Sequence, residues 1–188
     1  MFGPLAKFLP DLDGDRNVIR DAWNLVAGLP GGKILFSKMM GRLAPYTGTI
    51  DARVTALRPG FCQAVLADHR GVRNHLACIH AVALVNLAEL TGNAALLYSL
   101  PDDGRFIVAG LSIEYVKKAR GTITATSECP VPSSSARAEY EVPVVLTDAS
   151  GEVVARATLR SLVGPKRVGP KRVGPKRRPA SGAAADVN

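Results

Sequence analysis

The apolar positions of the chain first follow a helical spacing. Residues 15–28 carry apolar side chains at intervals of three and four, with Asp13 or Asp15 as the expected N-cap. A second stripe at the same spacing covers residues 34–43 and includes a phenylalanine and two methionines, which we interpret as packing surface. We therefore expect two amphipathic helices within residues 1–45.

The period then changes to two. Apolar and polar residues alternate over 50–56, which predicts a strand. The sequence Arg-Pro-Gly at 58–60 predicts a turn into a second run, 61–68, and these two runs should pair as a hairpin. Residues 71–79 lack either period and are expected to form a loop.

An apolar helix is expected next, from His80 to Leu90, stopped by the pair Thr91-Gly92. Pro143 within the later strands suggests a bulge or a sheet edge. The remaining strand candidates are 94–100, 106–116, 122–129, 138–146 and 153–162. A helix that is apolar nearly all round must be buried. The pattern therefore predicts an α+β fold in which a curved antiparallel sheet of five to six strands wraps around the central helix.

The net charge of +8 is concentrated at the C-terminus. From Val163 onward seven basic residues and one acid give +6, whereas the other 17 basic and 15 acidic residues give only +2. Residues 163–177 read VGPKR three times, and a five-residue repeat with Gly-Pro in each unit is expected to be disordered. The tail either attracts nucleic acid, acidic protein or anionic lipid, or merely solubilises the chain. No aromatic side chains interleave its charges for base stacking, which favours the second interpretation.

We divide the chain into N-terminal helices (1–45) packed on the same domain, a main domain (46–163) and a disordered basic tail (164–188). Apolar stretches are too short to predict a membrane span, and acidic residues interrupt the N-terminus before a signal sequence can form, so we expect a cytoplasmic protein. Three cysteines without a CxxC pair predict no disulfide framework. We expect no cofactor and no metal.

Glu89 is the only charged residue between Arg73 and Asp102. A carboxylate in such an apolar helix is either desolvated or points out through a gap in the packing. The alternative to a functional role is that Asn86 and Glu89, three residues apart, form one polar stripe that faces water. Helix spacing by itself leaves both interpretations open.

Two segments carry a resemblance to a known family. The phrases RPGFCQAVLADHRGVRNHLACIHAVALVNLAELTG and LSIEYVKKARGTITATSE resemble the hotdog-fold thioesterases of the phenylacetyl-CoA type, and more narrowly the family named domain of unknown function 4442. The resemblance covers residues 43–163. In that family an asparagine stands six residues before a histidine, and an acidic residue stands nine residues after it; Asn74, His80 and Glu89 fit this spacing.

The resemblance implies hydrolysis of an acyl-CoA or acyl-carrier-protein thioester by a homodimer or homotetramer. Backbone N–H groups near His80 and Ala81, at the positive end of the helix dipole, would polarise the thioester oxygen. Glu89 would come from a second subunit as general base or nucleophile, and Asn74 would position the water or the carboxylate. Ala81 stands where the family usually has glycine, and Val108 where some relatives carry a serine.

The basic turn with Lys117, Lys118 and Arg120 resembles one that lies near the coenzyme A phosphates in relatives; the alternative is a solvated turn. The other functions considered are an acyl-thioester dehydratase or hydratase, and a non-catalytic acyl-CoA binder. The dehydratase and hydratase motifs are missing, and the presence of Glu89 argues against a non-catalytic binder. A zinc site at His75, Cys78 and His80 does not fit a standard ligand pattern.

Overall fold

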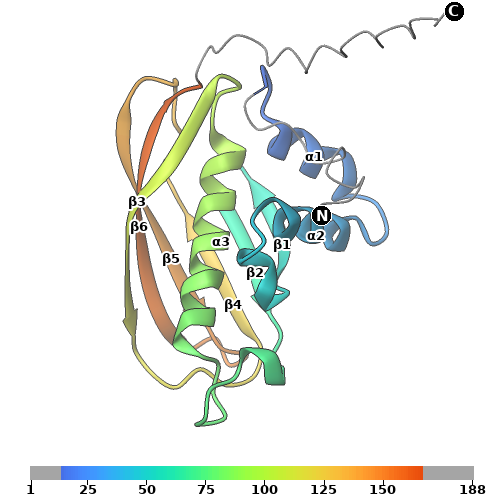
Figure 1. Ribbon diagram of the computed structural model, residues 1–188, viewed down its shortest axis with the longest axis vertical. Helices are drawn as coiled ribbons and strands as arrows, with labels where there is room; N and C mark the ends of the chain where they lie inside the picture. The colour runs from blue at the N-terminus through green and yellow to red at the C-terminus, as the bar shows by residue number, and fades with distance from the viewer. Residues whose placement is uncertain (1–13, 167–188) are drawn as a thin grey trace, which may run out of the picture.

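A computed structural model describes residues 14–166 of the chain. Six antiparallel strands form one sheet that curves around a long central helix (Figure 1). Almost all of the predicted basic tail lies outside the described residues. The elements in chain order are α1 (Val18–Val26), α2 (Gly32–Leu43), η2 (Thr47–Ile50), β1 (Arg53–Arg58), β2 (Phe61–Leu66), η3 (Arg70–Val72), α3 (Ala81–Ser99), β3 (Gly104–Tyr115), β4 (Ile123–Glu128), β5 (Ala138–Thr147) and β6 (Val153–Pro165). The predicted α+β architecture is confirmed.

The strand order is β1-β2-β4-β5-β6-β3, and every neighbouring pair is antiparallel. The predicted hairpin of β1 and β2 is present, and β1 and β3 are the two edges of the sheet. β3 pairs with β6 along its whole length but has no neighbour on its other side among residues 14–166. The strand that directly follows the central helix therefore presents an open edge.

The central helix is longer than predicted. α3 continues from Ala81 to Ser99, so the predicted stop at Thr91-Gly92 and the predicted strand at 94–100 are both wrong. A β-carbon on Gly92 would come within 3.1 Å of the Leu159 and Val142 side chains, so glycine here lets α3 approach the sheet closely. Tertiary packing thus overrides the local helix-breaking signal.

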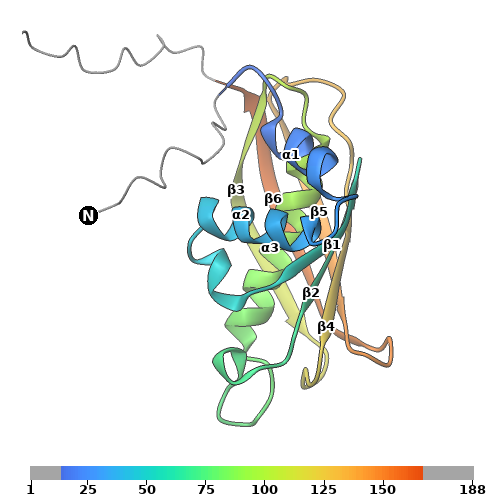
Figure 2. The same ribbon diagram turned by 90° about the vertical axis from the view of Figure 1, so that its right-hand side faces the viewer.

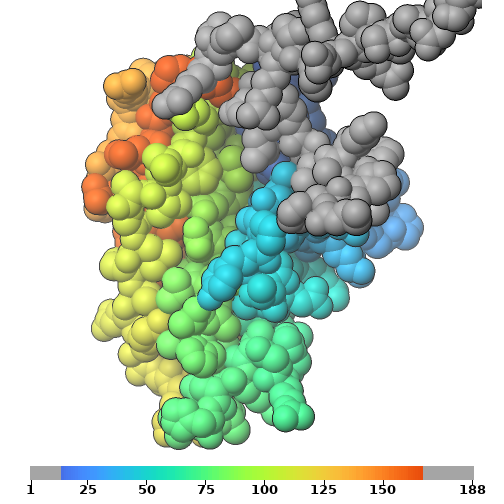
Figure 3. Space-filling model, viewed as in Figure 1, coloured from blue at the N-terminus to red at the C-terminus, as the bar shows by residue number. Residues whose placement is uncertain are grey.

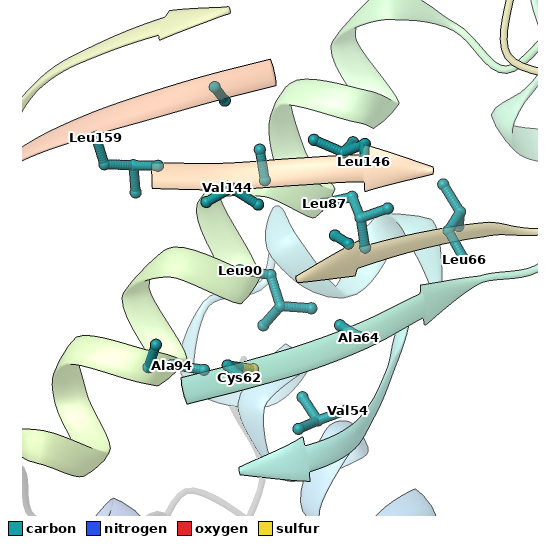
Figure 4. Close-up of a cluster of buried hydrophobic side chains, with 14 of the residues drawn as sticks. Val54, Cys62, Ala64, Leu66, Leu87, Leu90, Ala94, Val144, Leu146 and Leu159 are labelled. Carbon is teal, nitrogen blue, oxygen red and sulfur yellow. The ribbon is translucent and has the colours of Figure 1, made fainter. Parts of the chain in front are cut away.

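The core lies between α3 and the concave face of the sheet. Figure 4 shows side chains of α3 meeting those of the strands, among them Leu87, Leu90, Ala64 and Leu146. α3 is long and apolar enough to cross a membrane by length and composition, but most of that stretch is buried inside the sheet. It is the core helix of this fold.

The N-terminal helices lie on the same side of the sheet as α3 (Figure 2). Asn17, rather than the expected Asp13 or Asp15, caps α1 by accepting a hydrogen bond from the Arg20 N–H at 3.0 Å. Its amide nitrogen donates to the carbonyl oxygens of Leu97 and Leu100 at 2.7 and 3.0 Å. The side chain that begins α1 therefore also fixes α1 to the end of α3.

Two strand details differ from the simple alternation. Residues 47–50 form η2, so β1 begins only at Arg53. The register of β1 with β2 is irregular between Val54 and Ala56, and beyond this irregularity the side chain of Leu57 points into the core. Pro143 lies inside β5, beyond the last residue that pairs with β4, so its missing N–H interrupts no bond to that strand. Locally it occupies an edge, as one of the two predictions stated.

Candidate active site

A cavity of about 220 Å³ lies at the N-terminal end of α3. It brings together four of the residues that the sequence singled out, Asn74, Ala81, Lys117 and Lys118. His80, Glu89 and Arg120 do not line it. The full lining is Asn74, Leu76, Cys78, Ile79, Ala81, Leu84, Tyr115, Lys117, Lys118 and Ala119.

Asn74 shapes the loop that leads into α3. Its side-chain oxygen accepts hydrogen bonds from the N–H groups of Leu76 and Cys78 at 2.9 and 3.3 Å, and its own N–H donates to the Cys78 carbonyl at 2.8 Å. The side-chain oxygen is thus used within the loop. The side-chain amide nitrogen of Asn74 has no acceptor among residues 14–166 and can therefore donate to a bound molecule.

The first turn of α3 presents one N–H group without an acceptor. His80 caps the helix, its Nδ1 accepting from the Val82 N–H at 3.1 Å, while its own N–H donates to the Val72 carbonyl at 2.7 Å. The N–H groups of Ala83 and Leu84 both donate to the His80 carbonyl. The Ala81 N–H has no acceptor within the described chain, so the structure narrows the predicted donors to this one.

Tyr115 adds a contact that the sequence did not single out. Its hydroxyl donates to the Ala81 carbonyl oxygen at 3.2 Å, which ties the end of β3 to the first turn of α3. Partial burial raises the pKa of this phenol above its ordinary value. The signal was available, because Tyr115 closes the SIEY phrase that carries the family resemblance.

Asp68 joins the two loops that frame the cavity. One of its carboxylate oxygens accepts from Arg73 Nε at 2.6 Å, beside Asn74, and the other accepts from the Gly121 N–H at 3.0 Å. These bonds, with the Arg73 hydrogen bond as the largest cause, lower the pKa of Asp68. A single carboxylate thus fixes the asparagine loop relative to the basic turn.

The three basic residues of that turn differ in their surroundings. Lys117 Nζ forms an ion pair with Asp148 at 2.7 Å and another with Glu152. These contacts raise the pKa of Lys117 and hold that of Asp148 below its usual range. The charge of Lys117 is therefore largely offset. Lys118 and Arg120 are exposed and form no ion pair within residues 14–166, so phosphate binding remains a prediction that favours these two.

Glu89 lies on the outward side of α3. The residues of the helix that are not fully buried lie along this side: Ala81, Val82, Val85, Glu89, Asn93 and Leu97. Figure 3 shows green atoms of α3 at the surface between β3 and α2. The Glu89 carboxylate is half-buried and forms no hydrogen bond or ion pair with the described residues.

Asn86 does not share this stripe with Glu89. It is only 3% exposed, and its amide nitrogen donates to the Tyr46 carbonyl at 3.0 Å. The alternative in which both residues form one water-facing polar stripe is therefore wrong for Asn86. Glu89 follows Ala81 by eight residues, which is about 12 Å along the helix axis, so the two cannot act on one carbonyl group within a single chain.

The open edge strand β3 carries apolar side chains on both faces. Phe106, Leu111 and Ile113 are half-buried against the core, and Ile107, 67% exposed and paired with the exposed Leu162, lies on the opposite face of the sheet. Val108 lies opposite Ser161 of β6, whose buried hydroxyl has no partner among residues 14–166. The Ser161 hydroxyl of β6 therefore lies beside Val108 of β3, the position at which the family resemblance places a serine in some relatives.

Two larger cavities lie elsewhere in the described chain. One of about 570 Å³ lies between α2, η2 and β1, and one of about 360 Å³ lies between the start of α1, the end of α3 and the start of β3; none of the predicted site residues lines either. No cluster of three metal-ligating side chains occurs within residues 14–166. The three cysteines form no disulfide, and burial raises the pKa of Cys129 to about 11, which makes it a poor nucleophile.

A sheet of six antiparallel strands wrapped around one central helix, with the helix N-terminus at a cavity, defines a hotdog-fold protein. The chain belongs to the family described as Domain of unknown function (DUF4442), whose model matches residues 32–163. The match begins at α2 and ends near the end of β6, so it includes the second N-terminal helix as well as the whole sheet.

Solved structures agree with this assignment. The structural-genomics protein APC5556 is 30% identical with a TM-score of 0.68, over 79% of this chain and 99% of its own. PA5026 from Pseudomonas aeruginosa, a protein of unknown function described as a probable thioesterase, is 24% identical with a TM-score of 0.63, over 73% and 97% of the two chains. A thioesterase family protein from Silicibacter pomeroyi is 14% identical with a TM-score of 0.60, over 69% and 96%. No protein with a curated description matches the chain in sequence.

Proposed function

We propose that this protein hydrolyses acyl thioesters, carried by coenzyme A or by an acyl carrier protein, at a site shared between two subunits. The observation that carries the proposal is the division of the chemistry along α3. The Ala81 N–H, without an acceptor in the described chain, lies at one end of the helix, and an unpartnered carboxylate lies about 12 Å further along. Two solved structures of similar fold, described as a probable thioesterase from P. aeruginosa and a thioesterase family protein from S. pomeroyi, support the reaction class.

The donor half of the site fits a thioester carbonyl. An oxygen placed at the Ala81 N–H would face the positive end of the α3 dipole, and no acidic residue lies in the first turn to oppose the developing charge. Asn74 lines the same cavity, and its side-chain amide nitrogen would donate to the attacking water or to the carboxylate. These groups stabilise a tetrahedral oxyanion better than the uncharged thioester.

The partner subunit's Glu89 supplies the other half. As a general base it takes a proton from water while the water oxygen attacks the carbonyl carbon; collapse of the tetrahedral intermediate expels the thiolate, which takes up a proton. As a nucleophile it forms an anhydride that water then cleaves. Both routes yield a carboxylate and a free thiol.

The surfaces beside Glu89 support assembly with a second copy. The open backbone edge of β3 can pair with another strand, and the exposed Ile107 lies on it. The outward stripe of α3 is mostly apolar next to that edge. Pairing of two β3 edges would continue the sheet and bring two α3 helices side by side.

The test is release of free thiol from a panel of acyl-CoA substrates of different chain length, measured with a chromogenic thiol reagent. We expect turnover of at least one substrate, and Glu89→Gln should lower kcat by roughly a hundredfold to ten-thousandfold without changing the oligomeric state. Glu128→Gln, at an exposed glutamate at the end of β4, is the matched control. Full activity of Glu89→Gln would contradict the proposed catalytic role, and binding of acyl-CoA without turnover of any thioester would contradict the proposed reaction.

A further inference from the structure

The connection between α1 and α2 exposes large apolar side chains. Leu25 is 76% exposed, Leu29 59%, Leu35 56% and Ile34 41%, and we call these four residues the apolar tip. They all lie within an eleven-residue segment at the end of α1 and the start of α2. In Figure 1 this connection forms the right-hand margin of the molecule, away from the open edge of β3.

The apolar tip is held in a defined geometry. Gly31 has a φ of 74°, and a β-carbon on Gly32 would stand 1.7 Å from the Val26 carbonyl oxygen, so this turn requires both glycines. The Leu29 N–H donates to the Val26 carbonyl and the Gly32 N–H to the Leu29 carbonyl, each at 2.9 Å. The leucines are thus presented by a tight, hydrogen-bonded turn.

The inner sides of the same helices are well packed. Trp23 and Phe36 meet edge to face with ring centroids 5.0 Å apart, and both are buried. The hairpin therefore already buries its own apolar face. The four residues of the apolar tip do not take part in this packing, and an exposed apolar cluster of this kind marks an interaction surface.

The charged residues of α2 are all basic: Lys33, Lys38 and Arg42. The nearest acids along the chain are Asp21 of α1, which pairs with Arg16 at 3.1 Å, and the exposed Asp51 after η2. Lys38 and Arg42 are exposed one turn apart on α2 and form no ion pair within residues 14–166. Because Leu35 precedes Lys38 by three residues, the solvent face of α2 changes from apolar to basic along one side of the helix.

We propose that the α1–α2 hairpin binds the surface of an anionic lipid bilayer. Apolar side chains beside exposed cations match the two layers of such a surface, since the leucines can enter the acyl boundary while Lys38 and Arg42 reach the headgroup phosphates. A second copy of this chain is a poorer partner, because the basic solvent faces of two α2 helices would repel each other. The basic tail would add attraction to the same membrane.

The test is co-sedimentation of the full chain with vesicles of phosphatidylcholine and phosphatidylglycerol in equal parts, compared with vesicles of phosphatidylcholine alone. The protein should bind the anionic vesicles, and binding should weaken at high salt. Leu25→Glu with Leu35→Glu, and separately Lys38→Glu with Arg42→Glu, should each weaken binding about tenfold or more. The matched control, Val131→Glu with Leu162→Glu, places the same charges at exposed apolar residues elsewhere and should bind like the unchanged chain.

A full-length variant with Lys171, Arg172, Lys176 and Arg177 all changed to Ser separates the tail from the hairpin. This variant should still bind, more weakly, and should still respond to the changes in the apolar tip. The proposal is overturned if the unchanged chain does not bind anionic vesicles, or if the tail variant loses all binding while the tip variants bind normally. It is also overturned if Leu25→Glu with Leu35→Glu changes the oligomeric state measured by light scattering, because the tip would then be a contact between copies.

Discussion

The N-terminal turn of α3 and the middle of the same helix differ in how much of the site one chain supplies. At the N-terminal turn, hydrogen bonds accepted by Asp68 and Asn74 and one donated by Tyr115 fix a cavity around the Ala81 N–H. In the middle, Glu89 lies on a mostly apolar stripe and forms no hydrogen bond or ion pair with the described residues. The donor half is built by contacts within one chain. The carboxylate half lacks such contacts, and we expect a second subunit to cover it.

This difference has a physical basis. A helix N-terminus must have its N–H groups satisfied, so caps and loops gather around it in any fold. A carboxylate in the middle of a buried helix has no such local requirement, and placing it there costs stability unless it faces an opening. We therefore expect that changes at Ala81 and at Glu89 slow the same reaction, although at each site the two residues come from different subunits.

The largest effect is expected from removal of the Ala81 N–H. Ala81→Pro replaces this donor with a ring carbon and leaves the helix start intact, because proline is favoured at the first position of a helix and His80 already has the extended backbone that precedes proline. We expect kcat to fall about a hundredfold or more, with an unchanged Tm measured by differential scanning calorimetry. Ala81→Gly keeps the N–H and should keep the activity; equal loss in both variants would show that the donor is not what matters.

A smaller effect is expected at the rim of the donor half. Lys118→Ala combined with Arg120→Ala should raise KM for acyl-CoA roughly three- to tenfold with little change in kcat, since the loss concerns phosphate contacts outside the reacting centre. An acyl thioester of N-acetylcysteamine lacks those phosphates and should show no change. Lys38→Ala with Arg42→Ala is the matched control. An equal rise in KM for both substrates would remove the proposed role.

The smallest effect concerns the frame of the donor half. The lowered pKa of Asp68 means that its carboxylate stabilises the fold above the ordinary pKa of aspartate, and that this contribution is lost as the pH falls through the lowered value. Asp68→Asn should therefore cost about 1 kcal/mol or less at pH 7, and its difference from the unchanged chain should shrink below about pH 4. Urea unfolding at several pH values measures this; a difference that is independent of pH would contradict it.

The sequence predicted the sheet because its strands alternate in polarity and end at explicit turns. It did not predict the length of α3, because Thr91-Gly92 is a stop signal in isolation and a close packing contact in the folded core. The strand predicted for 94–100 failed for a related reason, since a fully buried segment lacks the periodicity that separates helix from strand.

The candidate site was predictable in its residue types but not in its bonds. Spacing and family resemblance brought Asn74, Ala81 and Glu89 forward. The backbone bond from His80 to Val72, and the ion pairs that offset the charge of Lys117, depend on residues that lie elsewhere along the chain. The catalytic roles and the expected cytoplasmic location stay predictions.

The shared site is tested most directly by hybrid dimers of two inactive chains. Ala81→Pro and Glu89→Gln chains carry different affinity tags, are expressed together, and are purified sequentially over both tags. In each hybrid, the intact Ala81 of one chain meets the intact Glu89 of the other at one of the two sites, so we expect about half of the thioester turnover of the unchanged dimer. Hybrids as inactive as either parent would contradict a site shared between subunits.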